Sequence, residues 1–371
     1  MKNILIVGAG FSGAILAREL AERANCSTLV LDVRDHIAGN CHTYRDPISN
    51  VMIHKYGPHI FHTKNQRVWE YINRFTTFGP YTHRVKAITA QGVFSLPVNL
   101  LTINQFFNKI LNPNEAYNLL QKLGDKSIHE PRNFEEQALK FVGPELYQTF
   151  FYGYTKKQWG CEPSELPASL LKRLPIRFNY DDNYFFDPHQ GIPVDGYSAI
   201  IEKILAHPKI TVQLNTKFTH DMPANYDHVF YSGTIDGFFD YRLGRIGYRT
   251  VTFERIDTKG DFQGSAQINY TNLNVPFTRI HEHKHFTPWE AHEKTVAFRE
   301  FSKETEPDDI PYYPKNLQVD QTLYQRYCEL AKTQPKITFV GRLGTYRYLD
   351  MDTTIAEALT VADEFIQRHK T

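Results

Sequence analysis

Three glycines near the start of the chain, Gly8, Gly10 and Gly13, have the spacing of a loop that binds a dinucleotide. In such a loop Gly8 permits a tight turn, Gly10 lets the backbone approach a pyrophosphate, and Gly13 lets a helix pack closely on a strand. Asp32 follows at about the distance in sequence, roughly 20 residues, where an acidic side chain accepts hydrogen bonds from ribose hydroxyls. A dinucleotide is therefore expected here, with its pyrophosphate at a helix N-terminus.

A second set of residues suited to chemistry is the densest aromatic cluster of the chain, at residues 150–160, where rings alternate with glycine, lysine and glutamine. Aromatic residues at helical spacing usually pack into a core, and on pattern alone that alternative stays open. The interleaved polar residues suit the mouth of a binding site better. Arg173 and Arg279 can supply planar guanidinium groups that match phosphate oxygens, although surface charge explains either arginine more simply. Rings beside arginines are what a nucleoside diphosphate needs.

Histidines form two further candidate groups. His59 and His62 flank a Gly-Pro turn, which a surface turn explains equally well. His281, His283 and His285 alternate and are expected to lie on one strand face, where they could hold a metal ion. The intervening Lys284 and the lack of an evident carboxylate partner weaken that reading, and the sequence predicts no metal site.

The elements that position these residues alternate between strands and helices. Residues 4–7 and 27–31 predict strands on either side of a helix over 14–21, and residues 85–96 predict a hairpin. Residues 104–171 read as helical. A helix over 197–205 and strands at 210–218 and 227–233 predict a return to the first sheet, and residues 241–301 predict an antiparallel sheet. The chain closes with a strand at residue 337, a glycine turn and a helix over 353–367, whose N-terminus would favour the negative charge of a reduced flavin.

Composition narrows the class of protein. Lys and Arg number 42 and Asp and Glu 41, so no net field attracts nucleic acid or an anionic membrane. The four cysteines are far apart and form no Cys-x-x-Cys pair, which favours a reduced, cytoplasmic protein. No apolar stretch approaches the length of a membrane span or a signal peptide. The 371 residues are enough for two or three domains.

Several motifs together resemble the bacterial UDP-galactopyranose mutases over almost the whole chain. They are the run from Lys55 to Thr63, Gly153-Tyr154-Thr155 with Lys157-Gln158-Trp159-Gly160, Ser164 to Ala168, Lys172-Arg173, Tyr180 to Phe185, and Gly341-Arg342-Leu343 leading to Tyr348 and Asp350-Met351.

The resemblance implies an isomerase that holds FAD, active in its reduced form, and interconverts UDP-α-D-galactopyranose and UDP-α-D-galactofuranose without net redox change. It implies a covalent step between flavin N5 and the sugar, a supply of galactofuranose for cell-surface polysaccharide biosynthesis, and a cytoplasmic homodimer. The sequence offers no Ser-His-Asp set and no evident carboxylate pair at this site, which fits a reaction in which the cofactor supplies the nucleophile.

The fold class implied combines α/β and α+β parts. A discontinuous Rossmann-like FAD-binding domain would comprise residues 1–84, 194–240 and 331–371. A helical domain with a mobile substrate lid would comprise 100–180, and a six-stranded antiparallel sheet domain 85–99, 181–193 and 241–330.

Carried over by position, the resemblance assigns three groups of site residues. The catalytic group is Arg173 and Arg279, which clamp the diphosphate, and His62. The cofactor group is Gly8, Gly10, Phe11, Ser12, Gly13, Asp32, Gly39, Asn40, His59, Ile60, Arg342, Asp350, Met351, Asp352, Thr353, Thr354, Ile355 and Ala356. The substrate group is His83, Phe150, Phe151, Tyr154, Thr155, Trp159, Arg173, Tyr184, Asn269, Arg279, Tyr313 and Tyr348.

Two positions depart from the family pattern: Ala38 stands where glycine is usual, and His83 where an asparagine commonly contacts substrate. The second departure leaves the sugar specificity open. The alternatives are a UDP-N-acetylgalactopyranose mutase, an FAD-dependent oxidoreductase of the amine-oxidase type, which shares the glycine motif, and a non-catalytic protein that binds nucleotide sugars.

Overall fold

A computed structural model describes residues 2–173 and 176–369, and the side chains of Lys172 and Arg173 lie outside that description. Its first sheet has five parallel strands in the order β10-β2-β1-β11-β17. The strands are β1 (Asn3–Val7), β2 (Ser27–Leu31), β10 (Ile210–Gln213), β11 (His228–Tyr231) and β17 (Ile337–Phe339). This order confirms the predicted return of the chain to its first sheet. The strand predicted over 210–218 ends earlier, at Gln213.

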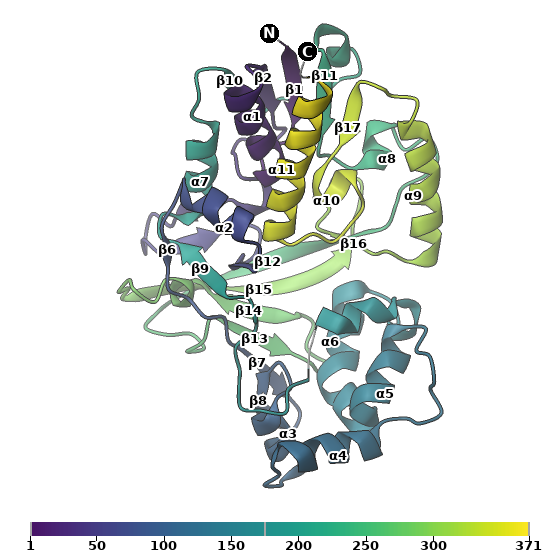
Figure 1. The fold of residues 1–371 in the computed structure, drawn as a ribbon. Helices are drawn as coiled ribbons and strands as arrows, with labels where there is room; N and C mark the ends of the chain where they lie inside the picture. Colours follow the sequence, from purple (N-terminus) through teal and green to yellow (C-terminus); the bar gives the residue numbers. More distant parts are fainter. Residues whose placement is uncertain (1, 174–175, 370–371) are drawn as a thin grey trace.

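Helices cover both faces of this sheet (Figure 1). On one face lie α1 (Phe11–Arg23), α7 (Gly196–Leu205) and α11 (Met351–Arg368), which bury Ile4, Ile6, Leu16 and Leu359 with them. On the other face lie α8 (Ile235–Phe238) and α9 (Gln318–Ala331), with an aromatic core around Tyr327. Because both faces are covered, the central strands are continuous apolar runs, as in other parallel sheets.

The second sheet has seven strands in the order β16-β12-β15-β14-β13-β7-β8. They are β7 (Val85–Thr89), β8 (Gly92–Leu96), β12 (Tyr248–Lys259), β13 (Gln267–Tyr270), β14 (Arg279–Glu282), β15 (Lys294–Glu304) and β16 (Tyr313–Pro314). The predicted hairpin at 85–96 is confirmed. The expectation of six antiparallel strands is wrong, because the sheet has seven strands and β13 pairs parallel with β7. These two strands are distant in sequence, so no hairpin dictates an antiparallel pairing.

A helical segment packs below the second sheet in Figure 1. It comprises α3 (Leu100–Phe107), α4 (Pro113–Leu123), α5 (Phe134–Leu146), a π-helical stretch (Tyr147–Tyr152) and α6 (Gly153–Trp159). Asn99, Asn112 and Asn133 cap α3, α4 and α5 by accepting from a backbone N–H three residues on. The apolar faces of these helices meet in a core that includes Leu120, Leu146 and Phe150.

Short strands join these parts: β3 (Thr43–Arg45) pairs with β4 (Met52–His54), and β9 (His189–Pro193) lies between β5 (Phe61–Thr63) and β6 (Phe78–Gly79). Two segments have contacts that bear on the expected domain division. Residues 189–193 pair with strands of the first part of the chain instead of the large sheet, and α9 packs with α8 and β17. Both of these contacts join segments that are far apart in sequence, so a local sequence pattern cannot predict them. The division as a whole stays a prediction.

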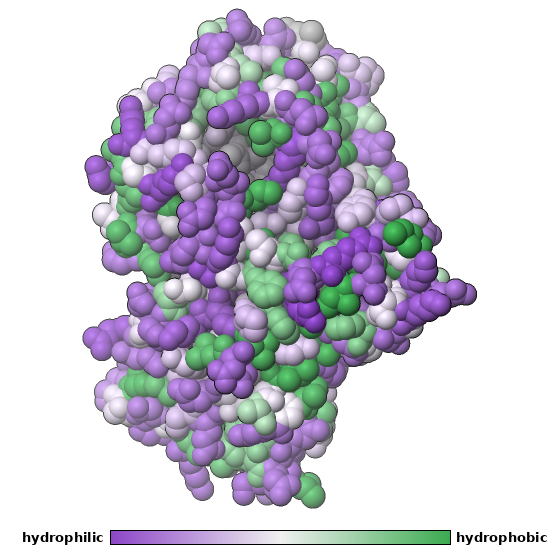
Figure 2. Space-filling model, turned by 180° about the vertical axis from the view of Figure 1, so that it is seen from behind, coloured by the Kyte–Doolittle hydropathy of each residue, from purple (hydrophilic) through white to green (hydrophobic). Residues whose placement is uncertain are grey.

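The face of the molecule turned away in Figure 1 is mostly hydrophilic (Figure 2). Apolar residues appear on it as separate patches, chiefly in the lower half, where the helical segment lies. Among the described residues, no helix has the length and apolar character needed to cross a membrane.

Candidate functional site

The glycine loop between β1 and α1 has the geometry that its sequence predicts. Gly8 has a φ of +106°, and a Cβ atom on Gly13 would lie 1.9 Å from the Gly8 carbonyl oxygen. A Cβ on Gly10 would meet nothing closer than the Gly39 Cα, at 3.9 Å. Gly8 and Gly13 thus serve the fold, whereas the space beside Gly10 is open for a ligand. The first turn of α1 has no side-chain cap, which leaves N–H groups for a phosphate.

Asp32 fastens this loop from the end of β2. Its Oδ2 accepts from the Ala9 N–H at 2.8 Å and its Oδ1 from the Arg34 N–H at 3.0 Å. A carboxylate has about four acceptor positions, so further ones remain for ribose hydroxyls.

Arg34 is a neighbour that the site prediction missed. Its guanidinium donates to Asn40 Oδ1 at 2.8 Å and lies 4.5 Å from the ring centre of Tyr56. Its Nη1 is buried without a hydrogen-bond partner. The signal was present in the sequence, because Arg34 follows the carboxyl end of a parallel strand, where ligands of such sheets bind.

The N-terminus of α11 lies beside the segment that carries the two Gly-Pro histidines. The Thr63 hydroxyl donates to Asp352 Oδ2 at 3.1 Å, and Asp350, the N-cap residue of α11, makes no side-chain capping hydrogen bond. Burial lowers the pKa of His59 to about 4, so its ring is neutral at pH 7. Among the predicted cofactor residues of this helix, Ile355 turns its side chain into the core instead, so only its backbone can serve the site.

His62 belongs to a stacked column of side chains. Its Nδ1 lies 2.5 Å from Asp187 Oδ2, and its ring stacks on Phe185 at 3.7 Å between centres. The ring of His83 lies on the same Phe185 at 6.0 Å, and burial lowers the pKa of His83 to about 3. Asp187 and Phe185 were not predicted, because their contact with His62 depends on the β5–β9 pairing.

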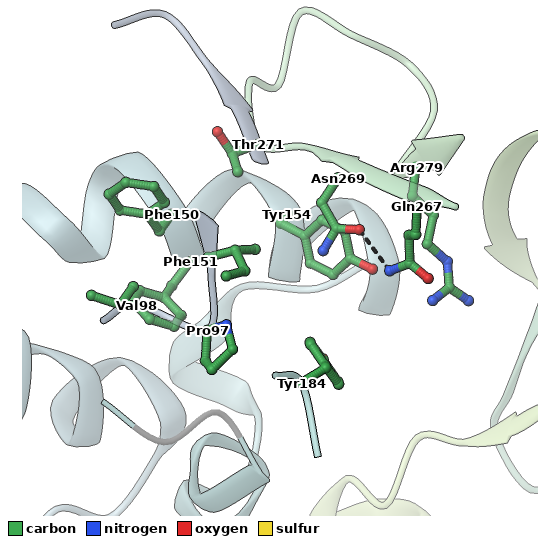
Figure 3. A pocket seen from close by; sticks show the side chains of 11 residues that line it. Pro97, Val98, Phe150, Phe151, Tyr154, Tyr184, Gln267, Asn269, Thr271 and Arg279 are labelled. Carbon is green, nitrogen blue, oxygen red and sulfur yellow. Dashed lines mark hydrogen bonds between the residues drawn. The ribbon is translucent and has the colours of Figure 1, made fainter. Parts of the chain in front are cut away.

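Eleven residues line an open pocket between the helical segment and the second sheet (Figure 3). Its empty volume, including solvent at the mouth, is about 560 Å³. Six predicted substrate residues line it, together with Leu96, Pro97, Val98, Gln267 and Thr271. The six are Phe150, Phe151, Tyr154, Tyr184, Asn269 and Arg279.

The two readings of the aromatic cluster turn out to be compatible. Phe150 is 4 % exposed and packs edge-to-face on Phe94 at 5.2 Å, as a core residue would. It also lines the pocket. Thr155, by contrast, is buried and is not among the lining residues.

Arg279 enters the pocket from the start of β14, and its Nε lies 2.9 Å from Oε1 of Glu300 on β15. Glu300 is fully buried, and its Oε2 lies 3.4 Å from His281 Nε2. Burial alone would lower the pKa of Arg279, but the charge of Glu300 raises it well above its ordinary value. Glu300 was not among the predicted site residues, because only the register of β14 on β15 brings it opposite Arg279.

A tyrosine pair extends from Arg279 toward α10 (Gly341–Gly344). The rings of Tyr313 and Tyr348 stack at 5.7 Å, and the Arg342 guanidinium lies 4.8 Å from the centre of the Tyr348 ring. Trp159 approaches Tyr313 at 6.5 Å. Arg342 is fixed by donating to the Leu349 carbonyl at 2.6 Å. The Arg173 side chain lies outside the described residues, so its predicted convergence with Arg279 stays a prediction.

The alternating histidines do not share a strand face. His281 is on β14, but His283 and His285 lie in a short 3-10 helix (His283–Phe286). In the described part of the chain, the one group with metal-ligand spacing is Asp261, Glu282 and His285. Glu282 already accepts from the N–H groups of residues 262–264. The Glu282 carboxylate of this cluster therefore stabilises the loop at residues 262–264.

Comparison with known proteins identifies the family. The profile of the UDP-galactopyranose mutase family matches residues 149–348, and that of an NAD(P)-binding Rossmann-like domain matches residues 6–75. The chain is 56% identical to a probable UDP-galactopyranose mutase of Klebsiella pneumoniae, over 98% of this chain and 95% of that protein. It is 50% identical to a dTDP-fucopyranose mutase of Escherichia coli, over 100% of both chains.

Solved structures agree at the level of the fold. A reduced UDP-galactopyranose mutase superposes with a TM-score of 0.78 at 16% identity, covering 100% of this chain and 97% of that one. A putrescine oxidase variant superposes with a TM-score of 0.59 at 11% identity, covering 99% of each chain, so the oxidase likeness is one of fold. On the strength of its sequence relatives, this chain is an isomerase and belongs to the UDP-galactopyranose mutase family.

Proposed function

We propose that the protein interconverts UDP-α-D-galactopyranose and UDP-α-D-galactofuranose, with FAD as a reduced cofactor and no net redox change. The observation that carries the proposal is the pocket in which an aromatic wall faces Arg279. The aromatic rings of the pocket can stack on a uracil base, and the Arg279 guanidinium can bind the oxygens of a diphosphate. The Tyr313–Tyr348 pair and Arg342 lead from this pocket toward the cofactor residues.

The residues of the first domain fit FAD. The open space at Gly10, the uncapped start of α1 and the unpartnered Nη1 of Arg34 are suited to its pyrophosphate, and Asp32 to its ribose. His59, Ile60 and the start of α11 would flank its ring. When bound and reduced, the cofactor supplies a nucleophile for the anomeric carbon of the sugar.

The side chains of the pocket would bind and orient the substrate. Arg279, together with Arg173, would stabilise the negative charge of UDP as it leaves the sugar. Burial raises the pKa of Tyr313 to about 12, so its hydroxyl stays protonated and can donate to a phosphate oxygen. Phe150, Phe151 and Tyr154 would exclude water from the leaving diphosphate, which strengthens these interactions.

Three further parts of the proposal depend on the family resemblance alone. They are a homodimer, a cytoplasmic location and a role in supplying galactofuranose to cell-surface glycans. A covalent step at the anomeric carbon of the sugar is a fourth.

A spectrum and a turnover assay test the proposal. The purified protein is expected to show flavin absorption and to convert UDP-galactofuranose to UDP-galactopyranose only after reduction with dithionite, as resolved by chromatography. UDP-N-acetylgalactopyranose and dTDP-fucopyranose, the second motivated by the 50% identical relative, serve as competing substrates. A yellow protein that releases peroxide with an amine and converts no UDP-sugar would contradict the proposal.

A further inference from the structure

The buried side of α6 carries an ammonium group in an unusual environment. Lys157 Nζ lies within hydrogen-bond distance of four backbone carbonyl oxygens, one at the end of β13 and three in the loop between β13 and β14. They belong to Tyr270 at 2.7 Å, Asn272 at 3.0 Å, Val275 at 3.0 Å and Phe277 at 2.9 Å. An ammonium group has three donors, so the carbonyls surround it much as water would. The Lys157 side chain thereby binds both ends and the middle of the loop through one ammonium group.

The same face of α6 meets this loop one turn earlier. A Cβ on Gly153 would lie 2.1 Å from the Thr271 carbonyl oxygen, so only glycine allows the helix to approach this closely. Gly153 and Lys157 are four residues apart and therefore lie on one face of the helix. The loop and the helix touch along that face.

The C-terminus of α6 is held to the sheet as well. Arg249 on β12 donates to the carbonyls of Gln158 at 3.0 Å and Lys157 at 3.3 Å, and the Ser302 hydroxyl on β15 donates to the Gln158 carbonyl at 2.6 Å. These donors satisfy carbonyl groups that a helix end leaves without partners. The short helix is thus fixed to the second sheet along its side and at its end.

The loop held by Lys157 joins two strands that carry pocket residues. Asn269 directly precedes Tyr270, and Arg279 follows Phe277 by two residues. Tyr154, on α6 itself, lines the same pocket (Figure 3). The contacts of Lys157 therefore connect the aromatic side of the pocket with the polar side.

We propose that Lys157 is a positioning residue of the nucleotide pocket: by holding the 270–277 loop on α6, it sets Tyr154 at its distance from Asn269 and Arg279. The inference rests on the proposed function, because it takes the pocket to bind a UDP-sugar. Loss of the ammonium group releases four carbonyls and lets both sides of the pocket move apart.

The test uses FAD-loaded enzyme and UDP as the probe, with Lys157→Met as the variant. Titration calorimetry is expected to show at least a tenfold weaker Kd for UDP, and KM for UDP-galactofuranose is expected to rise by the same factor with a smaller change in kcat. FAD content and the flavin spectrum stay as in the wild type. Lys156→Met is the matched control, because the Lys156 side chain is 37% exposed and its ammonium group pairs with Glu162 instead of the loop. This control is expected to bind UDP like the wild type.

Chemical rescue separates positioning from general stability. In Lys157→Ala, propylammonium replaces the missing atoms and should restore UDP affinity, whereas sodium at equal ionic strength should not. A flavin-loaded Lys157→Met that binds UDP with wild-type affinity would overturn the inference, whatever its melting temperature. If that variant does not fold, Lys157→Gln, which keeps N–H donors without the charge, is judged by the same criterion. Because binding is measured without turnover, a wild type that binds UDP but converts no UDP-galactofuranose refutes the proposed function alone.

Discussion

Arg279 Nε lies 2.9 Å from Oε1 of Glu300, across the neighbouring strands β14 and β15. The carboxylate is fully buried, while the arginine side chain is 20% exposed. The charge of the guanidinium is therefore compensated by a buried carboxylate, while the Arg279 side chain lines the pocket. A guanidinium fixed from behind is ready to receive an anion with little reorganisation.

Replacing the carboxylate should weaken both the fold and the site. We expect Glu300→Gln to lower the free energy of unfolding by about 3 kcal/mol, because one partner of a buried ion pair is left without compensation. We also expect kcat/KM to fall at least tenfold, since Arg279 loses its support. Denaturant unfolding and steady-state kinetics measure the two effects. Wild-type kcat/KM in a destabilised variant would show that Glu300 serves stability alone.

Removing the guanidinium should separate substrate binding from cofactor binding. Arg279→Ala, and likewise Arg173→Ala, is expected to abolish turnover of UDP-galactofuranose while FAD stays bound, because both arginines are assigned to the diphosphate of the substrate and not to the cofactor. The flavin spectrum and chromatographic assay report the two properties. Arg67→Ala, which removes an exposed arginine paired with Asp363, is the control and should remain active. Normal activity in either pocket variant would refute its assignment as a diphosphate clamp.

The glycine loop offers a matched pair of substitutions with different outcomes. Gly10→Ala should fold, because a Cβ there would make only an ordinary van der Waals contact with Gly39 Cα at 3.9 Å, but it should lose FAD by intruding on the pyrophosphate. Gly13→Ala should fail to fold or be strongly destabilised, because its Cβ would lie 1.9 Å from a backbone oxygen. Far-ultraviolet circular dichroism and bound-flavin content distinguish the two. A yellow, fully loaded Gly10→Ala protein would contradict the assignment of that space to the cofactor.

The contrast between the glycine loop and Glu300 shows what could be predicted from the sequence. Gly8, Gly10, Gly13 and Asp32 act within one continuous strand-turn-helix-strand unit, so their spacing along the chain largely determines their geometry. Glu300 acquires its role only through the register of two strands, which the spacing of residues along the chain does not encode.

The same limit explains the other differences. Strand β9 pairs with β5, over a hundred residues earlier, and this pairing alone brings Asp187 and Phe185 to His62. Likewise, Lys157 stood within a recognised motif, but its partners are backbone carbonyls more than a hundred residues away. A pattern of side chains says little about such contacts. Phe150, which is both core and pocket wall, shows that the alternatives weighed for the aromatic cluster were not exclusive.

The buried histidines predict a loss of stability in mild acid. Burial lowers the pKa of His59 to about 4 and of His83 and His283 to about 3, and it lowers those of His54 and His281 well below the ordinary value. The unfolded chain takes up these protons near pH 6.5, whereas the folded protein does not until its own lower pKa values are reached. The unfolded state thus binds more protons throughout this window. Stability is therefore full above about pH 6.5 and falls as the pH decreases toward 4.

The size of this effect can be measured by urea unfolding at several pH values. Each such histidine contributes about 1.4 kcal/mol per pH unit inside the window, and the measured slope gives the net number of protons taken up on unfolding. Carboxylates do not cause the loss of stability above pH 5. Burial would raise the pKa values of Glu282 and Asp46, but their hydrogen bonds lower them to about 2, so their contribution to stability is lost only in stronger acid. Replacing His83 with glutamine, which has no titrating ring, should reduce the slope of unfolding free energy against pH by about 1.4 kcal/mol per pH unit, the contribution of one proton. An unfolding free energy that stays constant between pH 7 and pH 5 would show that these rings are protonated in the folded protein, contrary to their burial.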